Sequence, residues 1–227
     1  MCMERKVAFA FLFVLLFPAL VLILSGDFFW PEGWIFSLWF IALCYSTIWY
    51  LYRRDPALLA ERYRKPGAGN QPKWDRYVLY GIVIGFSIWI VIMPLDAKRF
   101  GWSPASPLWL EALGLAMLAG SFFFFFRSYT DNTFLSPLVR IQEDRHQQVV
   151  STGVYGFVRH PMYLGGILMF IGSPLLLGST FGVLIGLIMT ALLMARILGE
   201  ETMLARELEG YREYMQKVRY RLVPFLW

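Results

Sequence analysis

Cysteine and histidine are scarce in this chain of 227 residues, which has two of each. Cys2 lies at the N-terminus and Cys44 lies within an apolar run, so the two thiols have the spacing neither of metal ligands nor of a disulfide framework. His146 and His160 are too few for a histidine-rich metal centre. The sequence therefore predicts no metal site and no structural disulfide.

Charge is also sparse, because charged residues make up 16% of the chain and hydrophobic residues 58%, with a mean hydropathy of +0.52. A soluble domain has no use for so much apolar surface. Several uncharged runs approach the roughly 20 residues that a helix needs to cross a bilayer. These runs do not alternate between polar and apolar residues as the strands of a membrane barrel do. We therefore predict an all-α, polytopic integral membrane protein.

The first part of the chain, residues 1–126, is predicted to be a transmembrane scaffold of four helices. Its apolar runs cover residues 7–24, 34–52, 77–95 and 108–126. The first run is longer than the apolar region of a signal peptide and no good cleavage site follows it, so we expect it to be retained. Between the second and third runs, residues 55–65 begin with Asp-Pro and predict a short amphipathic helix on the membrane surface.

The second part, residues 127–227, is predicted to form a separate functional region. A polar loop leads into a helical membrane hairpin at residues 161–198. A charged amphipathic tail follows at residues 200–227. We expect a helix from about Glu200 to Arg219, and Pro224 prevents it from continuing.

The distribution of basic residues predicts the orientation of the chain in the membrane. Lys and Arg gather at the N-terminus, in the second connection, in the polar loop and in the tail, whereas the connection after the third run holds two. The positive-inside rule then places the N-terminus, the polar loop, the tail and with them the active site on the cytoplasmic side of the membrane, which is the inner membrane if the protein is bacterial. The net charge of +5 follows from this bias, so we expect no nucleic acid partner.

Two groups of polar residues stand at the borders of the predicted hairpin. Arg159 and His160 precede Pro161, which suits the first turn of a helix. They would lie beside the free N–H groups of that helix, where a carboxylate is held well, or would anchor lipid head groups. Arg196 and Glu200 are four residues apart and share one helix face. Together they could bind an ammonium group or position a substrate. Alternatively, they form an ordinary surface ion pair with each other.

Three pieces of the second part occur in a specific order. They are GVYGFVRHPMYLGG at 153–166, the hairpin, and EETMLARELEGYREYMQKVRYRLVPFLW at 200–227. In this order they resemble the isoprenylcysteine carboxyl methyltransferase family, to which the phospholipid N-methyltransferases are related. Segments 55–64 and 132–153 also resemble bacterial members, whereas the first spans match only in hydrophobicity. Val154 departs from the family pattern, which has proline at this position.

The resemblance implies an enzyme that transfers a methyl group from S-adenosyl-L-methionine, held in a pocket between hairpin and tail. It implies that His160 and Tyr163 contact the methionine part of the cofactor and that Glu201 binds its amino group. The expected cofactor-binding residues are Gln142, Gly153, Val154, Tyr155, Arg159, His160, Pro161, Tyr163, Leu164, Gly165 and Glu201. The expected catalytic residues are Arg196 and Glu200, which match positions tied to activity and substrate orientation.

The acceptor is expected to be lipophilic and to reach the site from the surrounding membrane lipids. Candidates are an isoprenylcysteine-like carboxylate, a lipid or a small hydrophobic molecule. A membrane reductase of the sterol or steroid type that uses NADPH is the alternative, and a non-enzymatic membrane scaffold is the third possibility. The sequence specifies neither the acceptor nor the oligomeric state.

Overall fold

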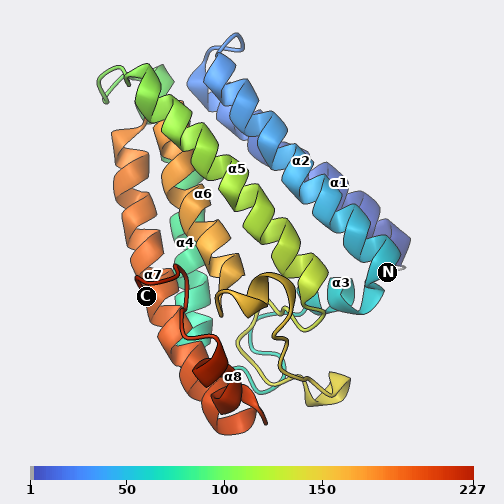
Figure 1. Ribbon diagram of the computed structural model, residues 1–227. Helices are drawn as coiled ribbons and strands as arrows, with labels where there is room; N and C mark the ends of the chain where they lie inside the picture. Colours follow the sequence, from blue (N-terminus) through green and yellow to red (C-terminus); the bar gives the residue numbers. More distant parts are fainter. Residues whose placement is uncertain (1–2) are drawn as a thin grey trace.

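The computed structural model describes residues 3–227 as a bundle of long helices, so Cys2 lies outside the described residues (Figure 1). The long helices are α1 (Met3–Ser25), α2 (Pro31–Arg54), α4 (Lys73–Pro94), α5 (Leu108–Asp131), α6 (Pro161–Leu177) and α7 (Thr180–Glu207). Residues 3–227 contain no strand. The predicted all-α fold is confirmed.

Within the described part of the chain, five helices are long and apolar enough to cross a membrane, namely α1, α2, α4 with the turn after it, α5 and α7. The four expected N-terminal spans correspond to the first four of these. Each helix extends beyond its apolar run, because polar residues at the run's ends continue the helical backbone. Arg53 and Arg54 thus end α2, and Lys73 begins α4. After α4 the chain continues into a π-helical turn, η1 (Leu95–Arg99).

The surface helix α3 (Pro56–Arg62) is shorter than the predicted segment. Asp55 caps it, since its carboxylate accepts a hydrogen bond of 2.9 Å from the backbone N–H of Leu58. Leu58 and Leu59 are buried, whereas most of the other face is exposed. The amphipathic pattern therefore packs one side of α3 against the end of the bundle.

The hairpin is formed by α6 and α7, and it turns at Gly178, whose φ of +79° suits glycine. The tail differs from the expected single helix. Instead, α7 continues through Glu200 to Glu207, the chain turns at Gly210 with a φ of +80°, and the short helix α8 (Tyr211–Lys217) follows. The backbone becomes extended at Leu208, which ends α7, and the left-handed Gly210 precedes α8, a break that the charge pattern does not indicate.

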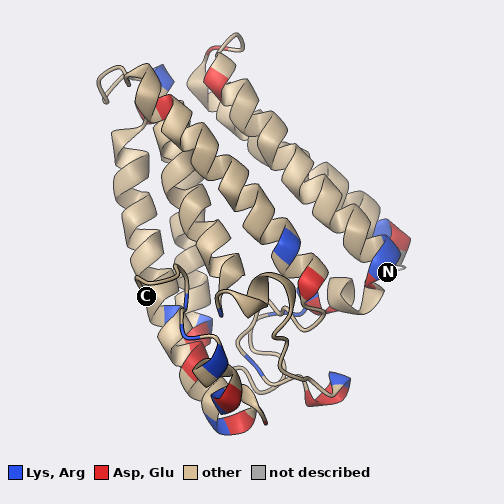
Figure 2. Cartoon of the chain, in the orientation of Figure 1, with Lys and Arg blue, Asp and Glu red and all other residues tan. Residues whose placement is uncertain are grey.

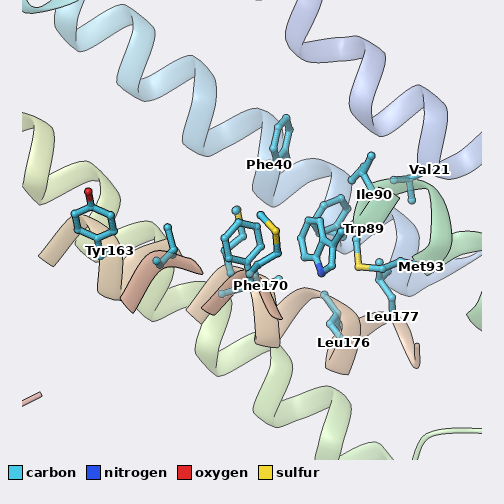
Figure 3. Packing of buried hydrophobic residues seen from close by; sticks show 14 of the residues in the cluster. Val21, Phe40, Trp89, Ile90, Met93, Tyr163, Phe170, Leu176 and Leu177 are labelled. Carbon is cyan, nitrogen blue, oxygen red and sulfur yellow. The ribbon is translucent and has the colours of Figure 1, made fainter. Parts of the chain in front are cut away.

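Helices α5 and α6 approach each other closely. A Cβ atom on Gly114 would lie 2.6 Å from the carbonyl oxygen of Gly172, and Ser121 donates a 2.8 Å hydrogen bond to the carbonyl of Gly165. Small residues thus serve helix packing within the chain, as is usual in membrane bundles. Deeper in the core, Trp89 meets Phe170 edge to face at 5.4 Å (Figure 3).

Charged residues gather at one end of the bundle, here called the polar end. Figure 2 shows Lys, Arg, Asp and Glu concentrated around the N-terminus, α3, the loops between α5 and α6, and the lower part of α7 with α8. The middle of the bundle is almost free of charge, and the opposite end carries a few charges of both signs (Figure 2), among them the ion pair of Lys98 with Asp27. This pattern is that of an integral membrane protein.

Candidate functional site

A cleft opens at the polar end between the loop that follows α5, the start of α6, α7 and α8. The expected site residues that line it are Tyr155, Arg159, His160, Pro161, Tyr163, Arg196 and Glu200. Its free volume is about 90 Å³, which is below the range of small-molecule pockets. A ligand of cofactor size must therefore displace side chains or loop residues at its walls.

Glu200 is the acidic residue that lines this cleft, and Tyr163 orients it. The Tyr163 hydroxyl donates a 2.6 Å hydrogen bond to the Glu200 carboxylate. Arg196 lies on the same helix but pairs with Asp75 of α4 at 2.7 Å and donates to the carbonyl of Pro137 at 2.7 Å. The expected i,i+4 pairing is therefore replaced, and Glu200 keeps its negative charge directed at the cleft.

Glu201, the next residue, does not line the cleft and is buried in an ionic cluster. Its carboxylate accepts from Arg159 at 2.6 Å and from Arg221 at 2.7 Å, and His160 Nε2 lies 3.2 Å away. Consecutive residues of a helix point about 100° apart, so one acid of the pair faces the cleft and the other faces the tail. Its role toward a cofactor stays a prediction.

Arg159 holds the C-terminal tail in place. Besides its bond to Glu201, its guanidinium donates to the carbonyls of Val218 and Arg219 at 2.6 and 2.7 Å. The backbone N–H groups of Arg159 and His160 donate to the carbonyls of Tyr220 and Arg221. Two segments sixty residues apart thus run side by side, and the tail closes one side of the cleft. We refer to these contacts of Arg159, His160, Glu201 and Arg221 as the tail clamp.

The short 3₁₀ helix η3 (Gly153–Gly156) positions Tyr155 in the cleft. Gly153 has a φ of +58° and packs against the Asp131 carboxylate, which also accepts a 2.9 Å hydrogen bond from the Val154 N–H. A side chain at position 153 would collide with this carboxylate. The turn forms without the proline of the family pattern, because Asp131 holds the Val154 N–H.

Two tyrosines of α8 complete the wall on the tail side. Tyr211 and Tyr214 line the cleft, and the Tyr214 hydroxyl donates to the Tyr155 carbonyl at 2.7 Å. Burial raises the pKa of the Tyr155, Tyr211 and Tyr214 hydroxyls. These hydroxyls are therefore neutral at physiological pH, and those of Tyr155 and Tyr211 can donate to a ligand, whereas the Tyr214 proton is used by the Tyr155 carbonyl.

The loop between α5 and α6 is attached to the N-terminal helices by a buried ion pair and by a backbone hydrogen bond to a buried acid. Arg140 donates to Glu61 of α3 at 2.8 Å, and both side chains are almost fully buried. Asp75 of α4 accepts from the Val139 N–H at 3.0 Å as well as from Arg196. The cleft wall is therefore supported by helices that precede it by more than sixty residues.

Several expected cofactor-binding residues do not line the cleft. Gln142 is fully buried and fixes the loop, since its amide donates to the Phe134 carbonyl and accepts from Arg145 at 2.8 Å. Leu164 packs in the core, and Gly165 packs against α5. Asn132 and residues 147–150 also line the cleft, although they were not among the expected site residues. They lie in segment 132–153, which the resemblance to bacterial members covers.

A second cavity, of about 350 Å³, lies among α2, α3, α4, α5 and α6. It is lined by Phe40, Leu43, Cys44, Thr47, Ile48, Leu51, Leu59, Arg62, Tyr63, Phe86, Phe125, Tyr129 and Met169. We call it the apolar cavity. Tyr129 lines this cavity and Asn132 lines the cleft, so the two spaces meet the end of α5 within one helical turn of each other.

Comparison with known proteins places these features in context. Residues 109–209 match the family model described as phospholipid methyltransferase. The chain is 31% identical over 85 residues to the protein-S-isoprenylcysteine O-methyltransferase of Schizosaccharomyces pombe, covering 37% of this chain and 36% of that protein. The corresponding protein of Saccharomyces cerevisiae is 30% identical over 133 residues, covering 58% of this chain and 55% of that one. The chain thus spans about half or less of these relatives.

The fold comparison extends further along the chain. A solved structure of a eukaryotic intramembrane Ras methyltransferase, isoprenylcysteine carboxyl methyltransferase, aligns with a TM-score of 0.57. The alignment covers 94% of this chain and 74% of that one, at 20% identity. The resemblance drawn from the motifs is confirmed, and the chain is similar to isoprenylcysteine and phospholipid methyltransferases in sequence and to an intramembrane methyltransferase in fold.

Proposed function

We propose that this protein is a membrane methyltransferase that binds S-adenosylmethionine in the cleft and a lipophilic acceptor in the apolar cavity. The observation that carries this proposal is that the linings of a polar cleft and of an apolar cavity come within one helical turn of each other at the end of α5. A charged donor and a hydrophobic acceptor need two such spaces with their openings close together. The sequence relatives support this function over the reductase and scaffold alternatives.

The residues of the cleft fit the chemical groups of this cofactor. Glu200 offers a carboxylate to its positively charged groups, and Tyr163 keeps that carboxylate oriented. His160 offers an imidazole, and Tyr155 and Tyr211 offer aromatic faces and hydroxyl groups. We assign to Glu200 the contact with the ammonium group that the resemblance implies for Glu201, because Glu201 is already bound within the tail clamp.

Arg159 and Glu201 are proposed to act on the cofactor through the tail. By fixing residues 218–221, the tail clamp keeps α8 over the cleft and limits the entry of water. Arg196, anchored by Asp75, is proposed to orient the acceptor at the inner side of the cleft.

When bound, S-adenosylmethionine supplies a methyl group that its sulfonium sulfur has already activated. Glu200, His160 and the cleft tyrosines would hold the cofactor, which would supply this methyl group to the lone pair of the acceptor and be left as a neutral thioether. The chain must therefore hold acceptor and donor in line and exclude water. A carboxylate acceptor releases no proton in this step, whereas an amine acceptor releases one to solvent.

The polar end is proposed to face the cytoplasm, as the basic residues around it favour. The cofactor would then enter from the cytoplasm and the acceptor from the lipid phase. Cysteine labelling from either side of sealed vesicles, with single cysteines in the 98–105 connection and in α8, would test this orientation.

Cofactor binding to the purified protein tests the proposal. We expect S-adenosylmethionine or its demethylated product, but not NADPH, to raise the thermal midpoint in a concentration-dependent manner. Glu200→Gln should weaken binding by about tenfold, since a charge-assisted hydrogen bond contributes about 1.5–3 kcal/mol. Glu207→Gln, an exposed change on the same helix, serves as the control. Protection by NADPH alone would contradict the proposal.

A further inference from the structure

Four consecutive apolar residues of the tail are exposed on the surface of the protein. They are Val223, Pro224, Phe225 and Leu226, and the last two are 90% and 81% exposed. Single exposed apolar side chains are common, whereas a contiguous group of them marks a surface that something else covers. We call these four residues the apolar tip.

The backbone around the apolar tip is closed into a turn. The N–H groups of Leu226 and Trp227 donate to the Val223 carbonyl, each at 3.2 Å. The Trp227 carbonyl in turn accepts from the N–H groups of residues 221–223, at 2.9, 3.1 and 3.4 Å. The tip is therefore an ordered part of the fold, and its exposure is not that of a loose segment.

Phe225 has a backbone conformation that is unusual for a large side chain. Its φ is +67°, in the left-handed region that residues other than glycine seldom adopt. Such conformations persist where the rest of the structure imposes them, and they are concentrated at functional positions. A disfavoured backbone that leaves a phenyl ring 90% exposed points to a contact outside the chain.

The apolar tip lies where the polar end of the bundle meets its apolar part. The N–H of His160, the residue before α6, donates to the Arg221 carbonyl at 2.9 Å. Leu222 is buried in the same core cluster as Leu193 and Ile197 of α7. Figure 1 shows that the end of the chain lies nearer the middle of the bundle than α8 does. The membrane that surrounds the bundle therefore begins close to the height of the tip.

The residues that precede the apolar tip are basic and aromatic. Residues 214–227 contain three basic residues and no acidic one. Lys217 and Arg219 are exposed, and the Tyr220 ring lies 5.3 Å from that of Phe225. Basic and aromatic side chains next to an apolar group are typical of a segment in the membrane interface, because rings and aliphatic groups enter the lipid while basic groups meet anionic head groups.

We propose that the apolar tip is a lipid anchor. Phe225 and Leu226 insert into the leaflet next to the polar end, and Lys217 and Arg219 bind the head groups of its anionic lipids. The tail is then held twice, from inside the protein by the tail clamp on residues 218–221 and from outside by the bilayer. The anchor fixes the position of α8 relative to the membrane surface as well as to the bundle.

A spin label tests where the apolar tip lies. The full chain with Cys2→Ser, Cys44→Ser and Leu226→Cys, which keeps the Phe225 ring, is labelled with a nitroxide. It is reconstituted in phosphatidylcholine nanodiscs that contain phosphatidylglycerol as the anionic lipid. We expect oxygen, which concentrates in lipid, to relax this label more strongly than a water-soluble nickel chelate does. A label introduced by Glu213→Cys, at an exposed position of α8, should show the reverse order.

Two results of this measurement would overturn the proposal. One is a label at position 226 that the nickel chelate relaxes more strongly than oxygen, because the tip would then lie in water. The other is a label that neither reagent reaches and that a second label broadens, because the tip would then lie between two copies of the chain.

Protease cleavage tests whether the lipid holds the tail. Phe225→Ser should raise the rate at which trypsin cuts after Lys217 in the nanodiscs by about tenfold, because moving a large apolar side chain from lipid to water corresponds to roughly one order of magnitude in partition. Phe225→Leu should stay within about threefold of the wild type, since it keeps an apolar side chain.

Phe29→Ser is the matched control for cleavage. Phe29 lies in the turn between α1 and α2, and its phenyl ring is 92% exposed, close to the value for Phe225. Its removal should leave cleavage after Lys217 at the wild-type rate. Wild-type cleavage in Phe225→Ser would show that the lipid does not hold the tail and would overturn the proposal.

These measurements use neither cofactor nor acceptor, so the lipid anchor is independent of the proposed function. A tip exposed to water in a protein that binds S-adenosylmethionine would overturn the anchor alone. A tip in lipid, in a protein that binds no S-adenosylmethionine, would support the anchor and refute the methyltransferase.

Discussion

Replacing Glu201 by glutamine should release the C-terminal tail from the rest of the protein. The carboxylate is 4% exposed and joins Arg159, His160 and Arg221, so its neutralisation leaves two guanidinium groups without their acid. Removing one partner of a buried ion pair costs about 3–5 kcal/mol. We take about 3 kcal/mol, because Arg221 is partly exposed and Arg159 keeps its carbonyl partners.

A loss of about 3 kcal/mol corresponds to a rise of roughly a hundredfold in the population of the open tail. Cleavage of a segment that opens and closes rapidly follows this population. Trypsin should therefore cut after Lys217, Arg219 or Arg221 about a hundred times faster in Glu201→Gln than in the wild type. The rate is measured by intact-mass spectrometry at several protease concentrations.

Glu207→Gln provides the matched control, because Glu207 is an exposed acid of the same helix. The two variants remove the same charge, and only one removes the clamp. If both were cleaved within about threefold of the wild-type rate, the tail would not be held by Glu201 and the role given to the clamp would be wrong.

Three further changes test the supports of the cleft and the bundle. Glu61→Gln should destabilise the protein by about 3 kcal/mol, since buried Arg140 then keeps only the half-exposed Asp144 as an acid partner, whereas replacing both Glu61 and Arg140 by apolar residues should be nearly neutral in thermal unfolding. Although burial raises the pKa of Glu61, hydrogen bonds from Arg140 and other groups outweigh it and lower the pKa below 4.5. The stability that Glu61 contributes is thus present above pH 4.5 and lost as the pH falls through the lowered value, so the pH dependence of the thermal midpoint below 4.5 should be weaker in Glu61→Gln. Gly114→Ala should cost about 1–3 kcal/mol by forcing α5 away from α6, whereas Gly81→Ala, with its nearest neighbour 3.9 Å away, should cost little.

The fold follows from the sequence because hydropathy acts over whole helices. Uncharged runs of about 18 residues identify the spans, since a bilayer admits few other structures. The residues at which the helices begin and end are less predictable. Arg53 and Arg54 are charged and yet helical, and Gly210 breaks a tail whose charge pattern suggested one helix. The predicted boundary between the transmembrane scaffold and the functional region, at residue 126, falls within α5, because the polar residues after Phe126 continue the helix.

The site is less predictable, because its geometry depends on contacts between distant segments. Glu200 and Glu201 are adjacent in the tail motif, and the sequence does not indicate which of them faces the cleft. The structure distinguishes them, because Tyr163 contacts Glu200 and Arg159 contacts Glu201. Asp75 stands at the border of a span like any interfacial acid. Its importance becomes visible when the fold brings it to Arg196, 121 residues away.

The ionic links from α3 to the loop and from α4 to α7 have a consequence for protein engineering. Hybrids between this chain and a relative are most simply joined between α4 and α5, which would leave the second half apparently complete. Such a hybrid loses Glu61 and Asp75, and with them the partners of two buried arginines. The first half of a hybrid must therefore contain acids at these two positions. Without them, the second half contains every motif residue and yet the wall of its cleft does not form.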